Sequence, residues 1–171
     1  RRNDAVQIER VIAEPDAGVK ESTADVRELL MHFRTRTNAE DITPALQTTL
    51  KKFEHQSGLA THLRIEGHGL PLAADVQVQV LHVVQEALSN VRKHAGARQV
   101  WVEVQQTPHW RVRVRDDGRG FANAAHDETH VGLRIMRERA ERIGADVCVT
   151  SAPGAGTCVE LTLPQVQAVA A

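Results

Sequence analysis

The pattern of hydrophobic and polar positions changes along the chain from a helical period to the alternation typical of strands. In the first 36 residues, apolar side chains recur from Val26 to Phe33 at the i, i+3, i+4, i+7 spacing of a helix with a narrow apolar stripe. The segment Pro15–Gly18 interrupts this pattern, so we expect the tail of one helix, a turn and a second helix. A narrow stripe suits a helix partner, which indicates part of a helical bundle.

Three further helices are predicted downstream. Thr43 and Pro44 form a good N-cap and first-turn pair for a helix that ends before Gly58. The longest apolar period follows at about Asp75–Ala95, and another helix is expected at about Gly132–Ile143.

Five segments alternate as strands do, and they lie mostly in the second half of the chain. A short hairpin connection at Thr107–His109 and a tight turn at Ala152–Gly156 join two pairs of them. Helices early and antiparallel strands later predict an α+β fold, a two-layer sandwich with helices on one face of a mixed sheet. The expected strands are Thr61–Gly67, Gln99–Gln105, Trp110–Asp116, Asp146–Thr150 and Thr157–Leu163.

Strict alternation places two polar side chains on the apolar side of the sheet. Asp116 shares parity with Val112 and Val114, and Thr157 shares parity with Val159. A carboxylate on a covered face costs several kcal/mol unless it finds donors, and the exocyclic amine of adenine is one such donor. The alternative is a turn acid that caps local backbone amides. We expect Asp116 and Thr157 to point into the same space between the layers.

The helix at Asp75–Ala95 carries a polar stripe beside its apolar face. Glu86 and Asn90 lie one turn apart on this stripe. A solvated face is the alternative interpretation, but asparagine is a poor residue for a helix interior. A hard cation would explain it, because Mg²⁺ is held by a few protein oxygens together with substrate phosphates. The core side is expected to be Val76, Val80, Val83, Val84, Ala87, Leu88 and Val91, and the stripe Gln79, His82, Glu86, Asn90 and Lys93.

Glycines stand at four positions where a ligand could approach the backbone. Gly118 and Gly120 follow Asp116, and Gly156 ends the turn before the last strand. Gly132 is expected just before a helix, whose first N–H groups could hold phosphate oxygens. Taken singly, such glycines are more often ordinary turn residues.

Composition narrows the class of partner. The chain has 171 residues with 21 Lys and Arg against 22 Asp and Glu, so it lacks the basic surplus that grips nucleic acid. Its two cysteines form no CxxC pair, which favours a reducing, cytoplasmic compartment. No apolar run approaches the roughly 20 residues that span a bilayer, so we expect no membrane contact by this segment. A metal site at His126 and His130 is a weak alternative, because a loop gives no fixed geometry.

Four motifs in order carry a resemblance to a known family. They are VVQEALSNVRKHA, which ends at Ala95, VRDDGRGF, which ends at Phe121, GLRIMRERA, which begins at Gly132, and GAGT, which ends at Thr157. From about Asp41 to Pro164 the chain resembles the catalytic and ATP-binding domain of bacterial sensor histidine kinases, in the superfamily that also holds gyrase, Hsp90 and mismatch-repair ATPases. Within it, the chain is most similar to the nitrate/nitrite sensor kinase type.

The resemblance implies a role for each motif. The glutamate that assists phosphoryl transfer falls on Glu86, and the asparagine that holds Mg²⁺ falls on Asn90. The aspartate that reads the adenine amine falls on Asp116. The remaining residues implied to bind ATP are Lys93 at phosphate, His94 near the base, Gly118, Gly120, Gly132, Leu133, Gly156 and Thr157.

The sequence also departs from the family pattern. Asp117 replaces the usual asparagine, and by parity we expect it to face the arginine side of the strand. The lid at Ala122–His130 is short and lacks a second aromatic residue. The family's phosphoacceptor motif, a histidine followed by an acid in the first dimerisation helix, is absent. His32 lies in the segment LLMHFR, which resembles the later part of the second dimerisation helix.

The resemblance therefore implies a division of the chain and a partial activity. Residues 1–38 would be the end of the dimerisation hairpin, 39–164 the ATP-binding domain and 165–171 a frayed tail. The full protein would be a homodimer that transfers the γ-phosphate of ATP to its own histidine and then serves a response regulator, in the cytoplasmic part of a membrane-anchored sensor. This segment would bind ATP but not autophosphorylate. The alternatives are an ATPase or serine kinase of the same superfamily, or an inactive nucleotide-sensing module.

Overall fold

The computed structural model describes residues 41–122 and 127–165. The chain forms two compact units, Arg1–Asn38 and Ala39–Ala171, each with most of its contacts within itself. All the described residues belong to the second unit. The helical bundle expected before residue 38, most of the predicted tail and the histidine at position 126 lie outside the described residues. No described helix combines the length and the apolar character needed to cross a bilayer.

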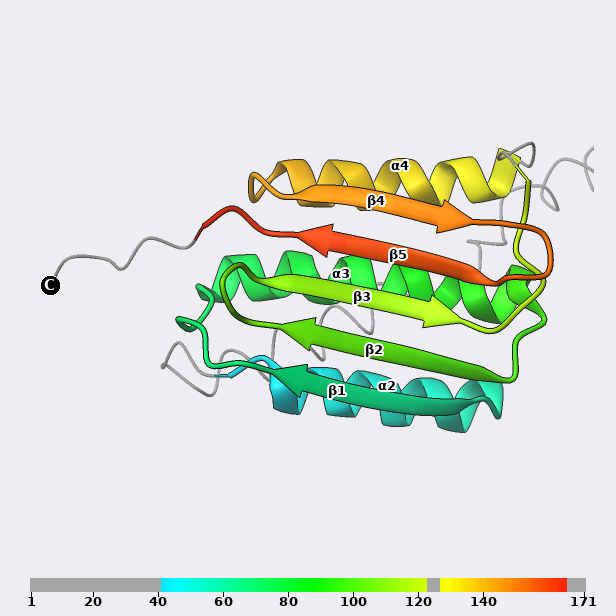
Figure 1. Cartoon of the computed structure of the whole chain (residues 1–171), viewed down its shortest axis with the longest axis horizontal. Coiled ribbons are helices and arrows are strands. Elements are labelled where there is room, and N and C mark those ends of the chain that lie inside the picture. The colour runs from blue at the N-terminus through cyan, green and yellow to red at the C-terminus, as the bar shows by residue number, and fades with distance from the viewer. Residues whose placement is uncertain (1–40, 123–126, 166–171) are drawn as a thin grey trace, which may run out of the picture. The chain divides into compact units, whose positions relative to one another are not determined.

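The described residues form a five-stranded mixed sheet in the order β1-β2-β3-β5-β4 (Figure 1). The β1–β2 pair is parallel, and the pairs β2–β3, β3–β5 and β4–β5 are antiparallel. This arrangement places the end of β3 and the start of β5 side by side. The strands are β1 (Ala60–Glu66), β2 (Gln99–Gln105), β3 (Arg111–Asp116), β4 (Asp146–Ser151) and β5 (Thr157–Thr162).

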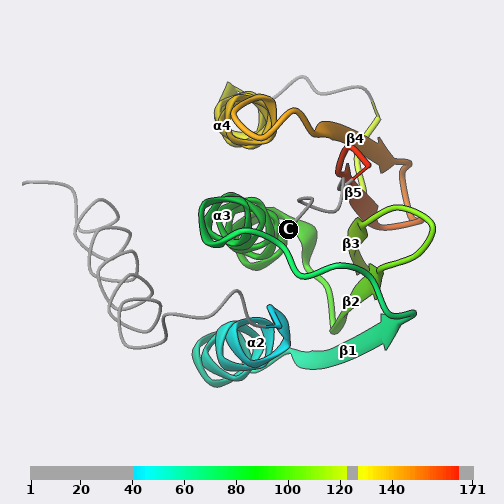
Figure 2. The ribbon, with the colours of Figure 1, turned by 90° about the vertical axis from the view of Figure 1, so that its left-hand side faces the viewer.

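Helices cover one face of this sheet, as Figure 2 shows in end view. They are α2 (Thr43–Ser57), α3 (Ala74–Asn90), which continues as a π-helical turn at Val91–Ala95, and α4 (Asp127–Glu141). Helix α3 lies in the middle of the helix layer, and α4 packs beside it. The predicted α+β two-layer sandwich is confirmed.

Both layers contribute to one core. Alternate residues of the strands point at the helices, as in β2, where Val100, Val102 and Val104 are at most 1% exposed. Most of the expected core side of α3 is buried, but Val76 is only partly covered. Gln77 is buried instead, and its amide donates to the carbonyl of Leu72.

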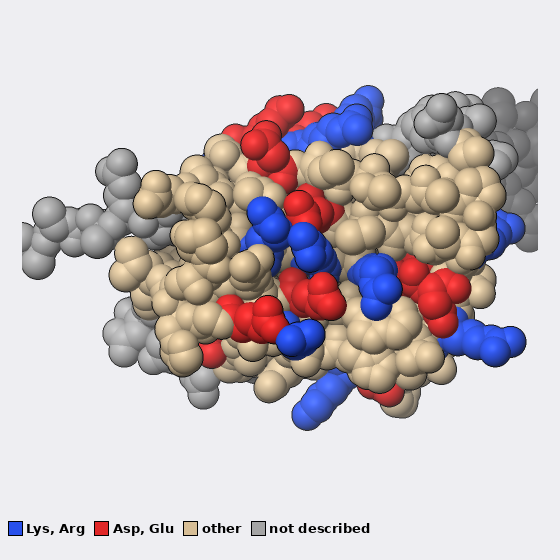
Figure 3. Space-filling view, in the orientation of Figure 1, with Lys and Arg blue, Asp and Glu red and all other residues tan. Residues whose placement is uncertain are grey.

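The other face of the sheet carries charge of both signs, interleaved (Figure 3). Arg113 on β3 pairs with Glu160 on β5, and the Arg115 guanidinium stands 4.5 Å from the ring centroid of Trp101. Such a surface is stabilised by cross-strand pairs rather than by a second layer.

Element ends differ from the sequence prediction in three places. Thr43 is not the N-cap of α2: that position is Ile42, and the carboxylate of Asp41 accepts hydrogen bonds from the backbone N–H and the hydroxyl of Thr43. The last turn of the long helix is π-helical, so the α-helix proper ends at Asn90. Helix α4 begins at residue 127, which shortens the loop expected at Ala122–His130. The other boundaries agree to within two residues.

Candidate active site

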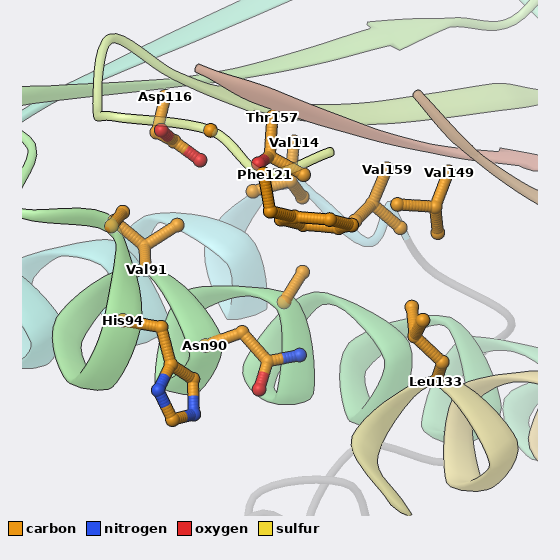
Figure 4. Close-up of a pocket in the computed structure, with 13 residues that line it drawn as sticks. Asn90, Val91, His94, Val114, Asp116, Phe121, Leu133, Val149, Thr157 and Val159 are labelled. Atoms are coloured by element: carbon orange, nitrogen blue, oxygen red, sulfur yellow. The ribbon is translucent and has the colours of Figure 1, made fainter. Parts of the chain in front are cut away.

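A cavity opens between the sheet and α3, at the edge where β3 ends and β5 begins (Figure 4). It encloses about 530 Å³ of space, part of it open to solvent. Its walls are mostly apolar, with a few polar groups. The lining residues are Ala87, Asn90, Val91, His94, Ala95, Val114, Asp116, Gly120, Phe121, Leu133, Val149, Thr157 and Val159.

Asp116 supplies the carboxylate at the sheet side of this cavity. The side chain is 4% exposed because it is the last inward residue of β3. Its Oδ1 accepts a hydrogen bond of 2.7 Å from the backbone N–H of Gly118. Burial raises the pKa of Asp116, although backbone N–H groups of Gly118 and Thr157 oppose that shift. A buried, desolvated acceptor of this kind is suited to a ligand that donates a hydrogen bond.

Asp117 serves the opposite face. Its carboxylate accepts hydrogen bonds of 2.8 and 3.0 Å from the backbone N–H groups of Arg98 and Gln99, and it is exposed. These two bonds, that from Gln99 first, lower the pKa of Asp117. The two adjacent acids therefore point in different directions, as their parity along the strand predicted. Asp116 faces the cavity, and Asp117 binds the backbone at the start of β2.

Thr157 lines the cavity beside Asp116. Its hydroxyl lies 2.8 Å from the hydroxyl of Ser151, the last residue of β4. The expectation that Asp116 and Thr157 share the space between the layers is confirmed, since both line the same cavity.

Glycines allow the loops around these side chains to pack closely. Gly156 has φ +72°, and a Cβ there would stand 2.1 Å from the carbonyl oxygen of Asp116. Gly120 lines the cavity with φ +59°, and a Cβ would stand 2.0 Å from the carbonyl oxygen of Ala152. Gly118 is buried against the carbonyl of Ala95 and does not line the cavity. Side chains at these positions would push the loops apart.

Asn90 and Glu86 approach the site from α3. Asn90 lines the cavity at the point where α3 turns π-helical, whereas Glu86 lies one turn earlier, outside the lining. Their side chains nevertheless converge: a Cβ built on Gly132 would meet Glu86 Oε1 at 2.6 Å, Asn90 Nδ2 at 3.1 Å and Asn90 Oδ1 at 3.2 Å. A carboxylate and a carboxamide thus meet at one point of α4.

We expected Gly132 to stand just before a helix, but it lies inside α4. The helix begins five residues earlier, in the segment DETH, whose acidic residues favour the first turn of a helix. The prediction that phosphate oxygens bind free N–H groups of a helix N-terminus at Gly132 is therefore wrong. Its missing side chain instead lets α4 lie directly against Glu86 and Asn90.

The remaining predicted residues differ in their distance from the cavity. Leu133 lines it from α4, and His94 lines it from the π-helical turn, although its imidazole points away from the sheet (Figure 4). The His94 carbonyl accepts a hydrogen bond of 2.8 Å from Arg119 Nε. Lys93 is exposed and does not line the cavity. Its contact with phosphate stays a prediction.

The polar stripe of α3 is not a solvated face, except at Lys93. Gln79, His82, Glu86 and Asn90 are all partly buried, because α4 packs beside α3. Burial lowers the pKa of His82, and the positive charges of Arg139 and Arg142 on and just after α4 lower it further.

Comparison with known proteins identifies the family of this chain. Residues 75–167 match the family described as histidine kinase-, DNA gyrase B-, and HSP90-like ATPase. The chain belongs to this family. All the motifs that carried the sequence resemblance lie within the matched region, which makes the described domain an ATP-binding domain of the ATPase type.

Individual relatives of the family cover most of this chain. The nitrate/nitrite sensor protein NarQ of Escherichia coli is 32% identical over 161 residues, which are 93% of this chain and 28% of that protein. The histidine-protein kinase/phosphatase DegS of Brevibacillus brevis is 32% identical over 85% of this chain and 38% of its own length. The chain thus spans roughly a third of these relatives.

A solved structure shows the same fold. The histidine kinase domain of a blue-light activated histidine kinase from Erythrobacter litoralis has a TM-score of 0.66 at 23% identity, over 91% of this chain and 77% of that one.

Sequence reasoning missed two residues at this cavity, one that lines it and one that contacts its lining. Phe121 lines the cavity, although the motif ending in this residue was read only for its acids and glycines. Ser151 contacts both Phe121 and Thr157 through its hydroxyl. Its position at the last residue of a strand, directly before a glycine turn, gave no chemical signal by itself.

Proposed function

We propose that this chain contains the catalytic and ATP-binding domain of a two-component sensor histidine kinase. Membership of the ATPase family supports ATP as the substrate. The narrower assignment rests on the relatives, whose names describe a nitrate/nitrite sensor and a histidine-protein kinase. The activity, the partners and the cytoplasmic placement of the whole protein belong to this proposal.

One observation carries it: a buried carboxylate and a carboxamide line the same cavity from opposite layers. Asp116 comes from β3 and Asn90 from α3. A buried carboxylate needs donors, and Gly118 supplies one at Oδ1. The exocyclic amine of adenine would be a further donor, so we place the base at the sheet side and the phosphates toward α3.

The residues near α4 fit a magnesium ion. Asn90 lines the cavity, its Oδ1 lies 3.2 Å from where a Cβ of Gly132 would stand, and a carboxamide oxygen is a ligand that Mg²⁺ accepts together with substrate phosphates. Asn90 would hold the ion, with the phosphates of ATP completing its shell. When bound, Mg²⁺ neutralises charge that develops on the transferred phosphoryl group.

In the reaction, a histidine nitrogen attacks the γ-phosphorus of ATP, the P–O bond to the β-phosphate breaks, and ADP leaves. The protein's contribution is to align these atoms and to exclude water. Glu86 would orient the attacking imidazole or take its proton. The histidine would come from a dimerisation helix of the same homodimeric protein, and a response regulator would receive the phosphoryl group. Because the sequence holds no phosphoacceptor motif, this chain should bind ATP without phosphorylating itself.

The test is a calorimetric titration of the 171-residue chain with Mg·ATP, for wild type and Asp116→Asn. A hydrogen bond to a charged group contributes about 1.5–3 kcal/mol, so the variant should bind about 10- to 100-fold more weakly. Asp117→Asn is the matched control, because it alters the neighbouring carboxylate that faces away from the cavity. Absence of saturable binding in wild type would refute the proposal, and equal affinities would remove Asp116 from base recognition.

A further inference from the structure

The hydroxyl of Ser151 joins three segments at the cavity. Ser151 Oγ accepts a hydrogen bond of 2.9 Å from the backbone N–H of Phe121, in the loop after β3. The same oxygen lies 3.0 Å from the carbonyl oxygen of Gly156 in the glycine turn. Thr157 Oγ1, at the start of β5, lies 2.8 Å away. One side chain thus contacts the loop, the turn and a residue that lines the cavity.

Counting protons fixes the direction of these bonds. A serine hydroxyl has one proton to donate and two lone pairs. The carbonyl oxygen of Gly156 can only accept, and no other hydrogen bond to it is seen among the residues that the structure describes. If Ser151 donates to Gly156, its lone pairs accept from Phe121 and from the hydroxyl of Thr157. All three contacts are then satisfied at once.

The alternative direction satisfies fewer groups. If Ser151 donated to Thr157, the carbonyl of Gly156 would lose this donor and Ser151 would keep an unused lone pair. An unpaired polar group in a part-buried site costs about 1–3 kcal/mol. The first arrangement is therefore favoured, and in it the Thr157 proton points at Ser151.

We propose that Ser151 is a positioning residue for base recognition, which makes Thr157 a hydrogen-bond acceptor toward the cavity. This inference rests on the proposed function and goes beyond it. In Figure 4 the Thr157 oxygen points toward Asp116, so the sheet side of the cavity presents two acceptors together. Two acceptors favour a base edge that carries an amino group. They disfavour hypoxanthine, which carries an oxygen in place of the amine of adenine.

Removing Ser151 Oγ should relax this selectivity. In Ser151→Ala, the Thr157 hydroxyl loses its fixed acceptor and can rotate to donate into the cavity. ATP then loses one well-directed acceptor, worth about 1 kcal/mol or about fivefold in affinity. ITP gains a donor that can meet its oxygen. We expect Ser151→Ala to weaken ATP about fivefold and to lower the ATP-to-ITP affinity ratio by about fivefold or more.

The experiment measures dissociation constants of ATP and ITP for the 171-residue chain by displacement of a fluorescent ATP analogue. The variants are Ser151→Ala, Ser151→Thr, which keeps a hydroxyl, and Thr157→Val with and without Ser151→Ala. We expect Ser151→Thr to restore the ratio. In the Thr157→Val background, Ser151→Ala should leave the ratio unchanged, because Ser151 acts through Thr157.

Ser57→Ala is the matched control. Its hydroxyl also accepts from a backbone N–H, that of Leu59, and donates to a backbone carbonyl, that of Phe53, but at the end of α2. It should cost similar stability and leave the ratio unchanged. A ratio unaltered by Ser151→Ala, or equally altered by Ser57→Ala, would overturn the inference while the proposed function stands. Wild type that binds neither nucleotide would refute the proposed function and this inference with it.

Discussion

Gly132 offers a way to disturb the proposed metal site without disturbing the fold. The change is Gly132→Ala in α4. A Cβ there would stand 2.6 Å from Glu86 Oε1 and within 3.2 Å of both amide atoms of Asn90. All three are ends of side chains, so they can move aside and the backbone can stay.

Two opposing effects set the stability of this variant. Alanine is favoured over glycine inside a helix by about 1 kcal/mol. Displacing Glu86 and Asn90 from their rotamers costs about 0.5–1.5 kcal/mol each. The gain offsets part of the cost, so we expect the free energy of unfolding to fall by about 0–2 kcal/mol.

Binding should respond far more strongly than stability. A displacement of about 1 Å in a positioned group can cost about 100-fold in a reaction, and we expect Mg·ATP binding to weaken about tenfold or more. Binding of ATP in the presence of EDTA should change little, because the residues proposed to contact the base, Asp116 and Thr157, lie on β3 and β5. Titration calorimetry with and without Mg²⁺, alongside thermal unfolding, measures both quantities.

Gly58→Ala separates this effect from a general effect of glycine substitution. No atom lies within 4 Å of a Cβ at Gly58, but its φ is +71°, so alanine is strained there by about 1–2 kcal/mol. That variant should lose stability and bind Mg·ATP normally. If Gly132→Ala retained the wild-type dependence on Mg²⁺, Asn90 would not hold the metal ion beside Gly132.

Further predictions concern acidity and a phosphate contact. Burial raises the pKa of Asp116, so its carboxyl group stays protonated to higher pH in the folded state than in the unfolded chain. The stability of wild type relative to Asp116→Asn should therefore fall as the pH rises from about 3.9 through the raised pKa. Backbone hydrogen bonds lower the pKa of Asp117, so stability relative to Asp117→Asn should fall as pH drops below about 3.9 through the lowered pKa. Urea unfolding of the three proteins across acid to neutral pH tests this, and profiles of the same sign would contradict it. Lys93→Ala should weaken ATP about three- to fivefold but leave adenosine unaffected, as an exposed ion pair contributes about 1 kcal/mol or less; equal effects on both ligands would argue against a phosphate contact.

Sequence alone predicted the parts of this site that depend on local periodicity. A strand alternates strictly, so Val112 and Val114 fixed the face of Asp116 and the opposite face of Asp117. The same argument placed Thr157. For these residues, the direction of a side chain follows from its neighbours along the chain.

Contacts between separate elements could not be read in this way. Helix α4 begins five residues before Gly132, and the period of its apolar residues does not mark where a helix begins. The role of Gly132 depends on the distance between α3 and α4, which no local pattern encodes. Ser151 acquires its three partners only when β4, the glycine turn and the loop after β3 come together.

These two kinds of information meet at the ends of elements, where the site lies. Asp116 ends β3, Thr157 begins β5, and Asn90 ends the α-helical part of α3. Each end frees backbone groups and space that a ladder or a helix would otherwise fill. Antiparallel pairing of β3 with β5 brings the first two ends together, and the helix layer brings the third across from them. A site of this form can therefore be altered at Gly132, which lets α4 lie close to Glu86 and Asn90, or at Ser151, which contacts Thr157. Neither change replaces a side chain that touches the nucleotide in the proposed complex.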